Sequence, residues 1–595
     1  MAWRSPTRRA VIALSALAVG AAALTTTGSA LSPQTPRAQT ADELLRQMTL
    51  EQKVGQLFVT YAYGRTADTP DPVNREEFGV DTPAQVVEKY HLGGIIHFTW
   101  SNSLYDPKQI AELSNGLQTA ATNSGARVPL LISTDQEQGQ VTRITEPATQ
   151  LPGNMALGAG RDPVAAERSA AITGQELRAM GLNMNFAPSG DVNVNPANPV
   201  IGVRSFSSDP ALAAQFTAAQ VRGYEDAQPA GEGVSASVKH FPGHGDTSTD
   251  SHTALPVIEH DRQQWEQLDA PPFKEAIAAG TDSVMSAHIV VPKLDDSGRP
   301  ATLAPNVLTG MLRQELGYRG VVFTDSLQME GVRQQFPDAE IPVLALQAGA
   351  DVMLMPQNLQ AAIDGVIAAV RDGRLTEQRI DESVRRVLEL KEHRGVLANP
   401  FVDVAKVDSV VGSREHLDEA QRITDRTTTL LRNDAALPLK SPGSVFVTGA
   451  SEKGTRALSD SVRARGPRSS ALATDLQPTP EQIGQAVEQA KGSDVAVVLT
   501  SAAWNPDNAS QLDLVRALQQ TGKPVIAVAT RDPYDAAHAD VPAWIASYSD
   551  KPVAMESVAK VLFGETTPAG KLPVPVPEPG KPGTDRYPFG FGLGW

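Results

Sequence analysis

The stretch VSASVKHFPGHGDTSTDSH (residues 234–252) joins an apolar run directly to a polar loop. Its first part, VSASVKH (234–240), is short, largely apolar and contains β-branched residues, which predicts a buried strand. From Lys239 to His252 it packs three histidines, two aspartates and a lysine into 14 residues. A strand that runs straight into ionisable side chains is typical of parallel sheets with a functional site at their carboxyl ends.

Seven further apolar runs of the same kind surround this stretch. They are GQLFVTY (55–61), GGIIHF (93–98), PLLISTD (129–135), LNMNFAP (182–188), DSVMSAH (282–288), GVVFTD (320–325) and ADVMLMP (350–356). Amphipathic helical patterns such as AAERSAAITGQELRAMG (165–181) lie between them. Eight β/α units predict an α/β protein whose residues 41–395 form a (β/α)8 TIM-like barrel.

Four of the eight predicted strands end in an ionisable side chain, namely Asp135, His240, His288 and Asp325. The carboxyl ends of barrel strands form the face that carries active sites. A single polar strand end means little, because any parallel strand can end in a polar loop. Four such ends favour a catalytic or binding site at this face.

A second α/β block follows the barrel. After a predicted linker over 396–415, residues 416–595 are expected to form an α/β sandwich domain. Its predicted strands are SVFVTGA (444–450), DVAVVLT (494–500), PVIAVAT (524–530) and AWIASYS (543–549). The segment 413–433 is predicted to be a helix. These runs indicate an open parallel sheet covered on both faces, and no GxGxxG or P-loop marks it as a nucleotide-binding domain.

Composition excludes several classes of partner and chemistry. The chain has 595 residues and a formal net charge of -16, and this acidic balance argues against a nucleic-acid partner. It has no cysteine, which rules out disulfides, thiolate metal sites and cysteine nucleophiles.

The N-terminus has the pattern of an export signal. Arg4, Arg8 and Arg9 precede an apolar run over residues 10–24, and the small residues GSA follow at 28–30. We therefore expect residues 1–40 to be a signal peptide and leader, and the protein to be secreted or extracytoplasmic without stable membrane insertion after cleavage. The Arg8-Arg9 pair resembles a twin-arginine signal. The alternative is an uncleaved anchor.

The His- and Asp-rich loop supports two chemical interpretations. A metal site would use the side chains His240, His244, Asp246, Asp250 and His252. Acid/base catalysis would use Asp250 and His252, because an aspartate beside an imidazole fixes its tautomer and stabilises the charged form. The residues alone leave both open, together with a merely structural loop.

Asp325 begins the second motif, GVVFTDSLQMEG (320–331). A carboxylate at this strand end can act as a nucleophile on the anomeric carbon of a sugar. From the residues alone a helix N-cap is the favoured interpretation, because aspartate caps helices readily.

The motifs KHFPGHGDTSTDSH (239–252), FTDSLQM (323–329) and STDQEQGQVTRI (133–144) resemble family 3 of the glycoside hydrolases, and more narrowly its NagZ-like β-N-acetylglucosaminidase branch. The segments GETTPAGKLPVPVP (564–577) and YPFGFGLGW (587–595) resemble the family's α/β sandwich domain, so the two-domain form is expected. The resemblance covers nearly the whole chain beyond residue 40.

This resemblance implies a retaining double displacement. Asp325 would be the nucleophile, and His252 the acid/base assisted by Asp250. The implied substrate is terminal, non-reducing β-linked N-acetylglucosamine, with peptidoglycan fragments (muropeptides) as its source. No cofactor and no metal are expected.

Sugar binding carries over from the resemblance to five residues. They are Asp135, Arg143, Lys239, His240 and Arg204. The alternative for each is a salt bridge at the barrel rim. His244 and Asp246 are expected to shape the loop, and His288 to support the site from behind. Gln138 and Gln140 stand where many members of the family have Gly and Arg, so the details of the subsites are expected to differ.

Other functions remain open at this stage. Within the family, the alternatives are a phosphorylase acting on the same glycosides and a β-glucosidase, although the Asp-x-His pair argues against the latter. Outside it, they are a metal-dependent hydrolase and a non-catalytic sugar-binding protein. The sequence makes no prediction of the oligomeric state.

Overall fold

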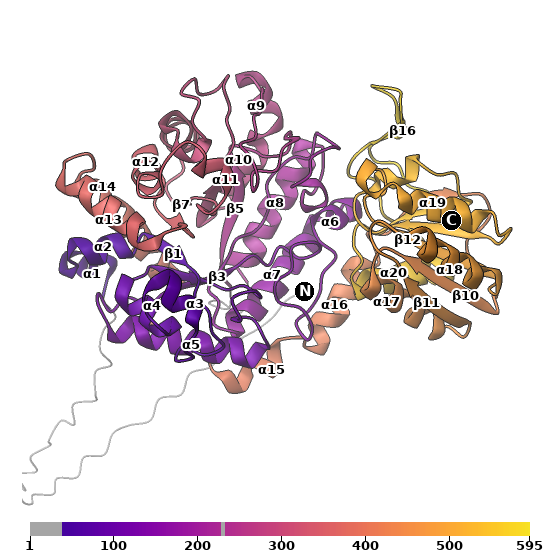
Figure 1. Cartoon of the computed structure of the whole chain (residues 1–595), viewed down its shortest axis with the longest axis horizontal. Helices are drawn as coiled ribbons and strands as arrows, with labels where there is room; N and C mark the ends of the chain where they lie inside the picture. Colours follow the sequence, from indigo (N-terminus) through magenta and orange to yellow (C-terminus); the bar gives the residue numbers. More distant parts are fainter. Residues whose placement is uncertain (1–38, 228–232) are drawn as a thin grey trace, which may run out of the picture. The chain divides into compact units, whose positions relative to one another are not determined.

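The computed structural model describes residues 39–227 and 233–595 (Figure 1). The export signal expected at the N-terminus therefore lies outside the described residues. None of the helices in the described ranges is long and apolar enough to cross a membrane.

Eight parallel strands form the first sheet, in the order β7-β6-β5-β4-β3-β2-β1-β8. They are β1 (Phe58–Thr60), β2 (Gly94–Ile96), β3 (Leu131–Thr134), β4 (Met184–Asn185), β5 (Ser235–Phe241), β6 (Ser283–Ser286), β7 (Val321–Phe323) and β8 (Met353–Leu354). A parallel bridge between Phe323 and Val352 joins the two ends of this order. The predicted (β/α)8 barrel is thus confirmed, and each predicted apolar run coincides with one strand, although β5 extends one residue beyond its run.

Helices surround the barrel strands (Figure 1). They are α1 (Ala41–Gln47), α2 (Leu50–Gly55), α3 (Pro72–Phe78), α4 (Pro83–Tyr90), α5 (Pro107–Asn123), α6 (Asn154–Gly160), α7 (Pro163–Ala179), η1 (Gly202–Arg204), α8 (Pro210–Glu225), α9 (Arg262–Leu268), α10 (Ala270–Ala278), η2 (Ala301–Leu303), η3 (Asn306–Glu315), α11 (Glu330–Arg333), α12 (Ile341–Ala348), α13 (Leu359–Arg371) and α14 (Glu377–His393). Asp106, Asp162 and Asp209 each cap the first turn of a helix and precede a proline. This Asp-Pro pair sets where α5, α7 and α8 begin, because proline suits the first helical position and aspartate accepts the unpaired N–H groups.

The second domain contains a sheet in the order β11-β10-β12-β13-β14-β9. Its strands are β9 (Thr429–Asn433), β10 (Ser444–Gly449), β11 (Arg468–Ala473), β12 (Val495–Thr500), β13 (Val525–Ala529) and β14 (Ala543–Ala546), and a hairpin of β15 (Val576–Pro577) and β16 (Asp585–Tyr587) follows. The helices after the barrel are η4 (Val404–Lys406), α15 (Val407–Val410), α16 (Arg414–Thr424), α17 (Glu452–Arg463), α18 (Pro480–Lys491), η5 (Pro506–Asn508), α19 (Ser510–Gln519), η6 (Pro533–Ala537) and α20 (Pro552–Leu562).

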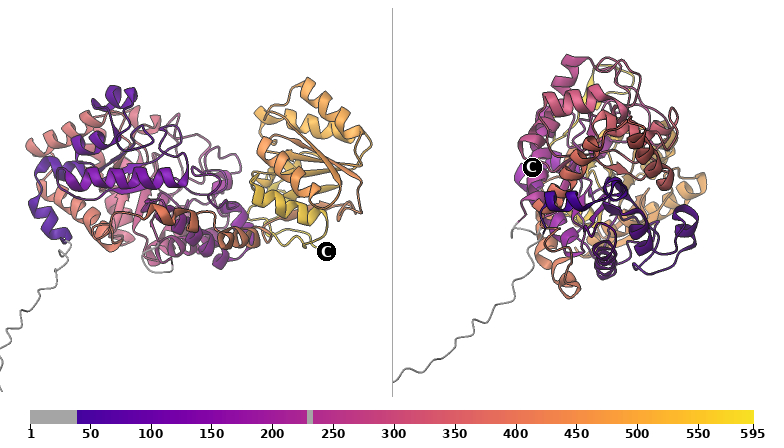
Figure 2. Two further views of the ribbon diagram at one scale, coloured as in Figure 1. Left: turned by 90° about the horizontal axis from the view of Figure 1, so that it is seen from below. Right: turned by 90° about the vertical axis from the view of Figure 1, so that its left-hand side faces the viewer.

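Alternate residues of β10 face different helical layers. Val445 and Val447 belong to the cluster that contains α17 and α20 residues, whereas Phe446 belongs to the cluster with α18 and α19 residues. Successive side chains of a strand point to opposite faces, so the sheet is buried on both sides, as predicted (Figure 2).

The predicted helix over 413–433 is wrong in its second half. Helix α16 ends at Thr424, and Thr429–Asn433 forms β9, which pairs antiparallel with β14. Residues 427–429 are three consecutive threonines, and β-branched residues favour strands. The sheet is therefore mixed at this edge. Edge strand β11 was not predicted, because half of its sequence RSSALA is polar and none of its residues is buried.

Candidate active site

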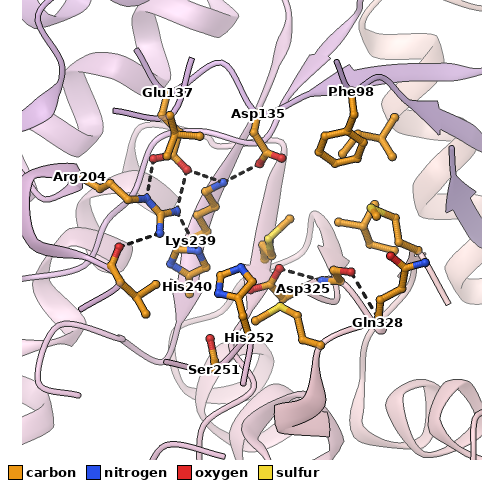
Figure 3. A pocket seen from close by; sticks show the side chains of 18 of the residues that line it. Phe98, Asp135, Glu137, Arg204, Lys239, His240, Ser251, His252, Asp325 and Gln328 are labelled. Carbon is orange, nitrogen blue, oxygen red and sulfur yellow. Dashed lines mark hydrogen bonds and ion pairs between the residues drawn. The ribbon is translucent and has the colours of Figure 1, made fainter. Parts of the chain in front are cut away.

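A pocket of about 500 Å³ opens at the carboxyl ends of the barrel strands (Figure 3). Its volume is in the range of pockets that bind small molecules. Seven of the eight residues predicted for catalysis or sugar binding line it: Asp135, Arg143, Arg204, Lys239, His240, His252 and Asp325. The eighth, Asp250, is not among the lining residues but contacts His252.

A cluster of opposite charges forms the floor of the pocket. Lys239 Nζ lies 2.8 Å from both Asp135 Oδ1 and Glu137 Oε1. The Arg204 guanidinium donates to both oxygens of Glu137, at 2.9 and 2.7 Å. The Lys239 and Glu137 side chains are only 4% and 2% exposed. Two predicted sugar-binding residues, Lys239 and Arg204, thus meet around the Glu137 carboxylate, and a third, Asp135, pairs with Lys239.

Glu137 is the residue that the sequence analysis missed in this cluster. Burial disfavours the ionised form, yet the charges of Arg204 and Lys239 hold the pKa of Glu137 well below its usual range. Burial likewise opposes the charge of Lys239, and Asp135 and Glu137 nonetheless raise its pKa. The position of Glu137, two residues after Asp135, could have indicated that it belongs to the site, because alternate residues of an extended segment point the same way.

His240 is oriented by a second carboxylate that sequence reasoning missed, Asp191. His240 Nδ1 lies 2.6 Å from Asp191 Oδ2, and Asp191 Oδ1 accepts a 2.7 Å hydrogen bond from the backbone N–H of His244. Burial opposes ionisation of Asp191, but His240 and His244 hold its pKa below the usual value. Asp191 lies three residues beyond the run predicted as the fourth strand, which is why it was not singled out.

Asp325 follows β7 and is partly exposed to the pocket. Its Oδ1 accepts a 2.7 Å hydrogen bond from the backbone N–H of Ser326. Burial opposes its ionisation, and the nearby His240, His288 and Lys239 outweigh this and lower its pKa. The favoured helix-cap interpretation is wrong, because the next helix, α11, has Met329 at its N-cap. Asp325 is an ionised carboxylate facing an open pocket.

His252 and Asp250 form a pair at the pocket mouth. His252 Nδ1 lies 2.7 Å from Asp250 Oδ1, and their side chains are 61% and 38% exposed. Burial opposes ionisation of Asp250, while hydrogen bonds from the backbone and side chain of His252 lower its pKa. Since the carboxylate accepts the proton of Nδ1, Nε2 is the nitrogen left to exchange a proton.

The other ionisable residues of this loop have separate partners. His244 lies 3.0 Å from Thr247 Oγ1 through Nδ1 and 3.1 Å from Ser251 Oγ through Nε2. Asp246 pairs with His260 at 2.9 Å. The five side chains considered as metal ligands are thus divided among different contacts, and the described ranges contain no group of three or more His, Asp or Glu residues arranged to hold a metal ion.

His288 and Arg143 occupy different parts of the site. Burial lowers the pKa of His288, whose Nε2 lies 3.0 Å from the carbonyl oxygen of Ser326, directly behind Asp325. Arg143 is exposed, and its guanidinium lies 5.6 Å from the centre of the Phe98 ring. Gln138 is buried, with its amide 3.1 Å from Thr173 Oγ1. Neither Gln138 nor Gln140 lines the pocket, so these departures lie outside it.

Comparison with known families places this geometry in context. Residues 49–390 match the glycosyl hydrolase family 3 N terminal domain, and residues 428–595 match the family's C-terminal domain. The chain belongs to glycoside hydrolase family 3. The pocket of this family 3 protein therefore lies entirely within the part that matches the N-terminal domain.

Relatives of this family 3 protein carry hexosaminidase names. It is 33% identical to β-hexosaminidase A of Pseudoalteromonas piscicida over 551 residues, which are 83% of this chain and 90% of the relative. It is 28% identical to a β-N-acetylglucosaminidase/β-glucosidase of Cellulomonas fimi over 586 residues, or 89% and 94% of the two chains. A solved family 3 β-N-acetylglucosaminidase from Paenibacillus sp. strain FPU-7 superposes with a TM-score of 0.81 at 40% identity, covering 89% of this chain and 99% of that one. The protein is a glycosidase of the hexosaminidase type.

Proposed function

We propose that this protein removes terminal, non-reducing β-linked N-acetylglucosamine by a retaining double displacement. One observation carries the proposal: the Asp325 carboxylate and the Asp250–His252 pair meet at a single pocket whose floor is a buried cluster of charges. Such a pocket suits the end of a sugar chain, because buried charged groups can replace water around its hydroxyls. The names of the relatives support the acetamido sugar.

In the first step Asp325 attacks the anomeric carbon. A carboxylate oxygen forms the bond to that carbon as the bond to the leaving-group oxygen breaks, and protonated His252 gives that oxygen its Nε2 proton. The product is a covalent glycosyl-enzyme with a neutral imidazole beside it.

In the second step the same imidazole acts as a base. Neutral His252 takes a proton from water, whose oxygen attacks the anomeric carbon and releases the Asp325 carboxylate. Two inversions give net retention of configuration. Asp250 holds Nδ1 through both steps, so that Nε2 alone donates and accepts the proton.

The substrate hydroxyls are assigned to the floor. Lys239, His240 and Arg204 are donors held in place by Asp135, Glu137 and Asp191, so their orientation is set before a sugar arrives. Arg143 adds a donor from the rim. Pre-set donors lose less conformational entropy on binding than mobile ones do.

We further propose that the protein acts outside the cytoplasm, on peptidoglycan fragments. The support is the N-terminal sequence, where Arg8 and Arg9 precede an apolar run over residues 10–24. The expected assay is release of N-acetylglucosamine from purified muropeptides by culture medium or by the extracytoplasmic fraction. Activity confined to the cytoplasmic fraction would contradict the location.

The decisive test of the chemistry compares aryl glycosides that differ only at carbon 2. We expect the acetamido sugar to be turned over far faster than glucose, and a preference for glucose would reject the proposed substrate.

Azide, added as an external nucleophile, tests the roles of Asp325 and His252 separately. With Asp325→Ala it should give the α-glycosyl azide in one inversion, and with His252→Ala the β-glycosyl azide through the covalent intermediate. The opposite anomers would reject the roles.

A further inference from the structure

Exposure varies systematically across the pocket. The Lys239 and Glu137 side chains on the floor are almost fully buried, whereas the side chain of His252 at the mouth is 61% exposed. Trp100 also lines the pocket, and 49% of its surface is exposed. A terminal sugar that fills the floor places its leaving group at the mouth. Trp100 therefore lies where the leaving group emerges.

The Trp100 ring is held in place from several sides. It stacks on Phe98 with centroids 4.9 Å apart and an angle of 18°, and it meets Tyr61 edge-on at 4.7 Å. Its backbone lies in a turn closed by the hydrogen bond from Asn102 N–H to Thr99 O. An aromatic ring fixed in this way binds a partner with little loss of conformational entropy.

The neighbours of Trp100 connect it to the candidate catalytic groups. The hydroxyl of Tyr61 accepts a 2.9 Å hydrogen bond from Gln328, which lines the pocket three residues after Asp325. Phe98, beneath Trp100, also packs under the guanidinium of Arg143. The ring therefore belongs to the same rigid assembly as the pocket wall.

Leaving this ring exposed has a cost that a ligand would remove. Apolar surface in water is unfavourable at roughly 25 cal/mol per Å², and an exposed aromatic at a pocket mouth marks a binding surface more often than an isolated one elsewhere. One face of a pyranose ring presents mainly C–H groups, while its hydroxyls project around the edge. Such a face can cover the indole while the hydroxyls stay hydrated.

We propose that Trp100 forms a subsite for the sugar ring of the leaving group, so that the protein prefers substrates in which a second hexopyranose follows the terminal sugar. This inference rests on the proposed function, because it assumes a terminal sugar on the pocket floor. It makes Trp100 a determinant of leaving-group specificity, separate from recognition of the acetamido group.

Two substrates isolate the contribution of Trp100. A β-1,4-linked disaccharide of N-acetylglucosamine has a sugar as its leaving group, whereas the leaving group of N-acetyl-β-glucosaminyl fluoride is a fluoride ion. For Trp100→Ala we expect kcat/KM to fall about tenfold or more on the disaccharide and to change by less than about twofold on the fluoride. Trp100→Phe should recover part of the loss.

Tyr105 provides a matched control. It is 66% exposed, lies five residues further along the chain and does not line the pocket. Tyr105→Ala should leave both substrates unaffected. An equal loss on both substrates with Trp100→Ala, or no loss on the disaccharide, would overturn the subsite. If the wild-type protein turned over neither substrate, the proposed function itself would fail, which is a distinct result.

Discussion

His240 Nδ1 lies 2.6 Å from Asp191 Oδ2, and both side chains are buried. The other oxygen of Asp191 accepts a hydrogen bond from the backbone of His244, near the start of the loop that carries Asp250 and His252. One carboxylate thus orients a pocket-lining imidazole at the end of β5 and also fixes where the loop leaves the strand. We therefore expect the site to depend on Asp191, although no substrate atom has to touch it.

Asp191→Asn keeps the shape of the side chain and removes its charge. We expect kcat/KM to fall roughly 10- to 100-fold, since a hydrogen bond to a charged group contributes about 1.5–3 kcal/mol. Steady-state kinetics on an aryl N-acetyl-β-glucosaminide measure this. Asp364→Asn, an exposed residue on α13, is the control. Equal activity of the Asp191→Asn and Asp364→Asn variants would show that the charge of Asp191 does not contribute to the site.

Glu137→Gln leaves Lys239 and Arg204 without their shared buried counter-charge. Breaking a buried ion pair by removing one partner costs about 3–5 kcal/mol. We expect the free energy of unfolding in urea to fall by that order, and KM to rise in the surviving folded protein. Glu112→Gln, on the exposed side of α5, should change neither quantity. A stable Glu137→Gln variant with wild-type KM would contradict the role of the cluster.

The sequence predicts the barrel well because its strands are buried on all sides. The apolar composition of runs such as GVVFTD (320–325) is enough to predict that they are buried. By contrast, β9 is an edge strand with the sequence TLLRN, of which only the first three residues are buried, and β11 (RSSALA) is half polar with no buried residue, so neither shows such a run. Local pattern predicts elements whose environment is uniform and misses those set by pairing with distant strands.

The sequence predicted contacts in the site between residues that are close in the chain, but not contacts between residues that only the fold brings together. Asp250 and His252 are two residues apart, so their pairing could be anticipated from spacing. Glu137 meets Arg204 across 67 residues, and Asp191 meets His240 across 49. Nothing in the local sequence of either carboxylate indicates its partner. Whether Asp325 caps a helix depended on where α11 begins, which only the fold determines.

His260 links the loop that carries Asp246 to the N-cap of α10, because it contacts Asp246 at 2.9 Å and Asp269 at 2.7 Å. Hydrogen bonds to Asp246 and then Asp269 raise its pKa to about 10, from an ordinary value of 6.5. Because the folded value is the higher one, the stabilisation is complete below pH 6.5 and disappears as the pH rises through 10. The difference in unfolding free energy between wild type and His260→Gln should therefore shrink across this interval.

Urea unfolding of both proteins at several pH values between 6 and 10 measures this effect. His393→Gln is a suitable control, because His393 lies at the exposed end of α14. A difference between wild type and His260→Gln that stayed constant or grew with pH would show that His260 is not held in its charged form.

Asp250→Asn tests the proton-handling pair directly. The amide can still contact Nδ1 of His252 but cannot stabilise the imidazolium that protonates the leaving group. We expect kcat/KM on substrates with poor leaving groups to fall about 100-fold. An activated aryl leaving group needs little protonation, so kcat/KM on such a substrate should fall less. Asp296→Asn, at an exposed position of the loop after β6, should keep the wild-type activity on both kinds of substrate. An equal loss on both kinds of leaving group would assign Asp250 a structural role alone.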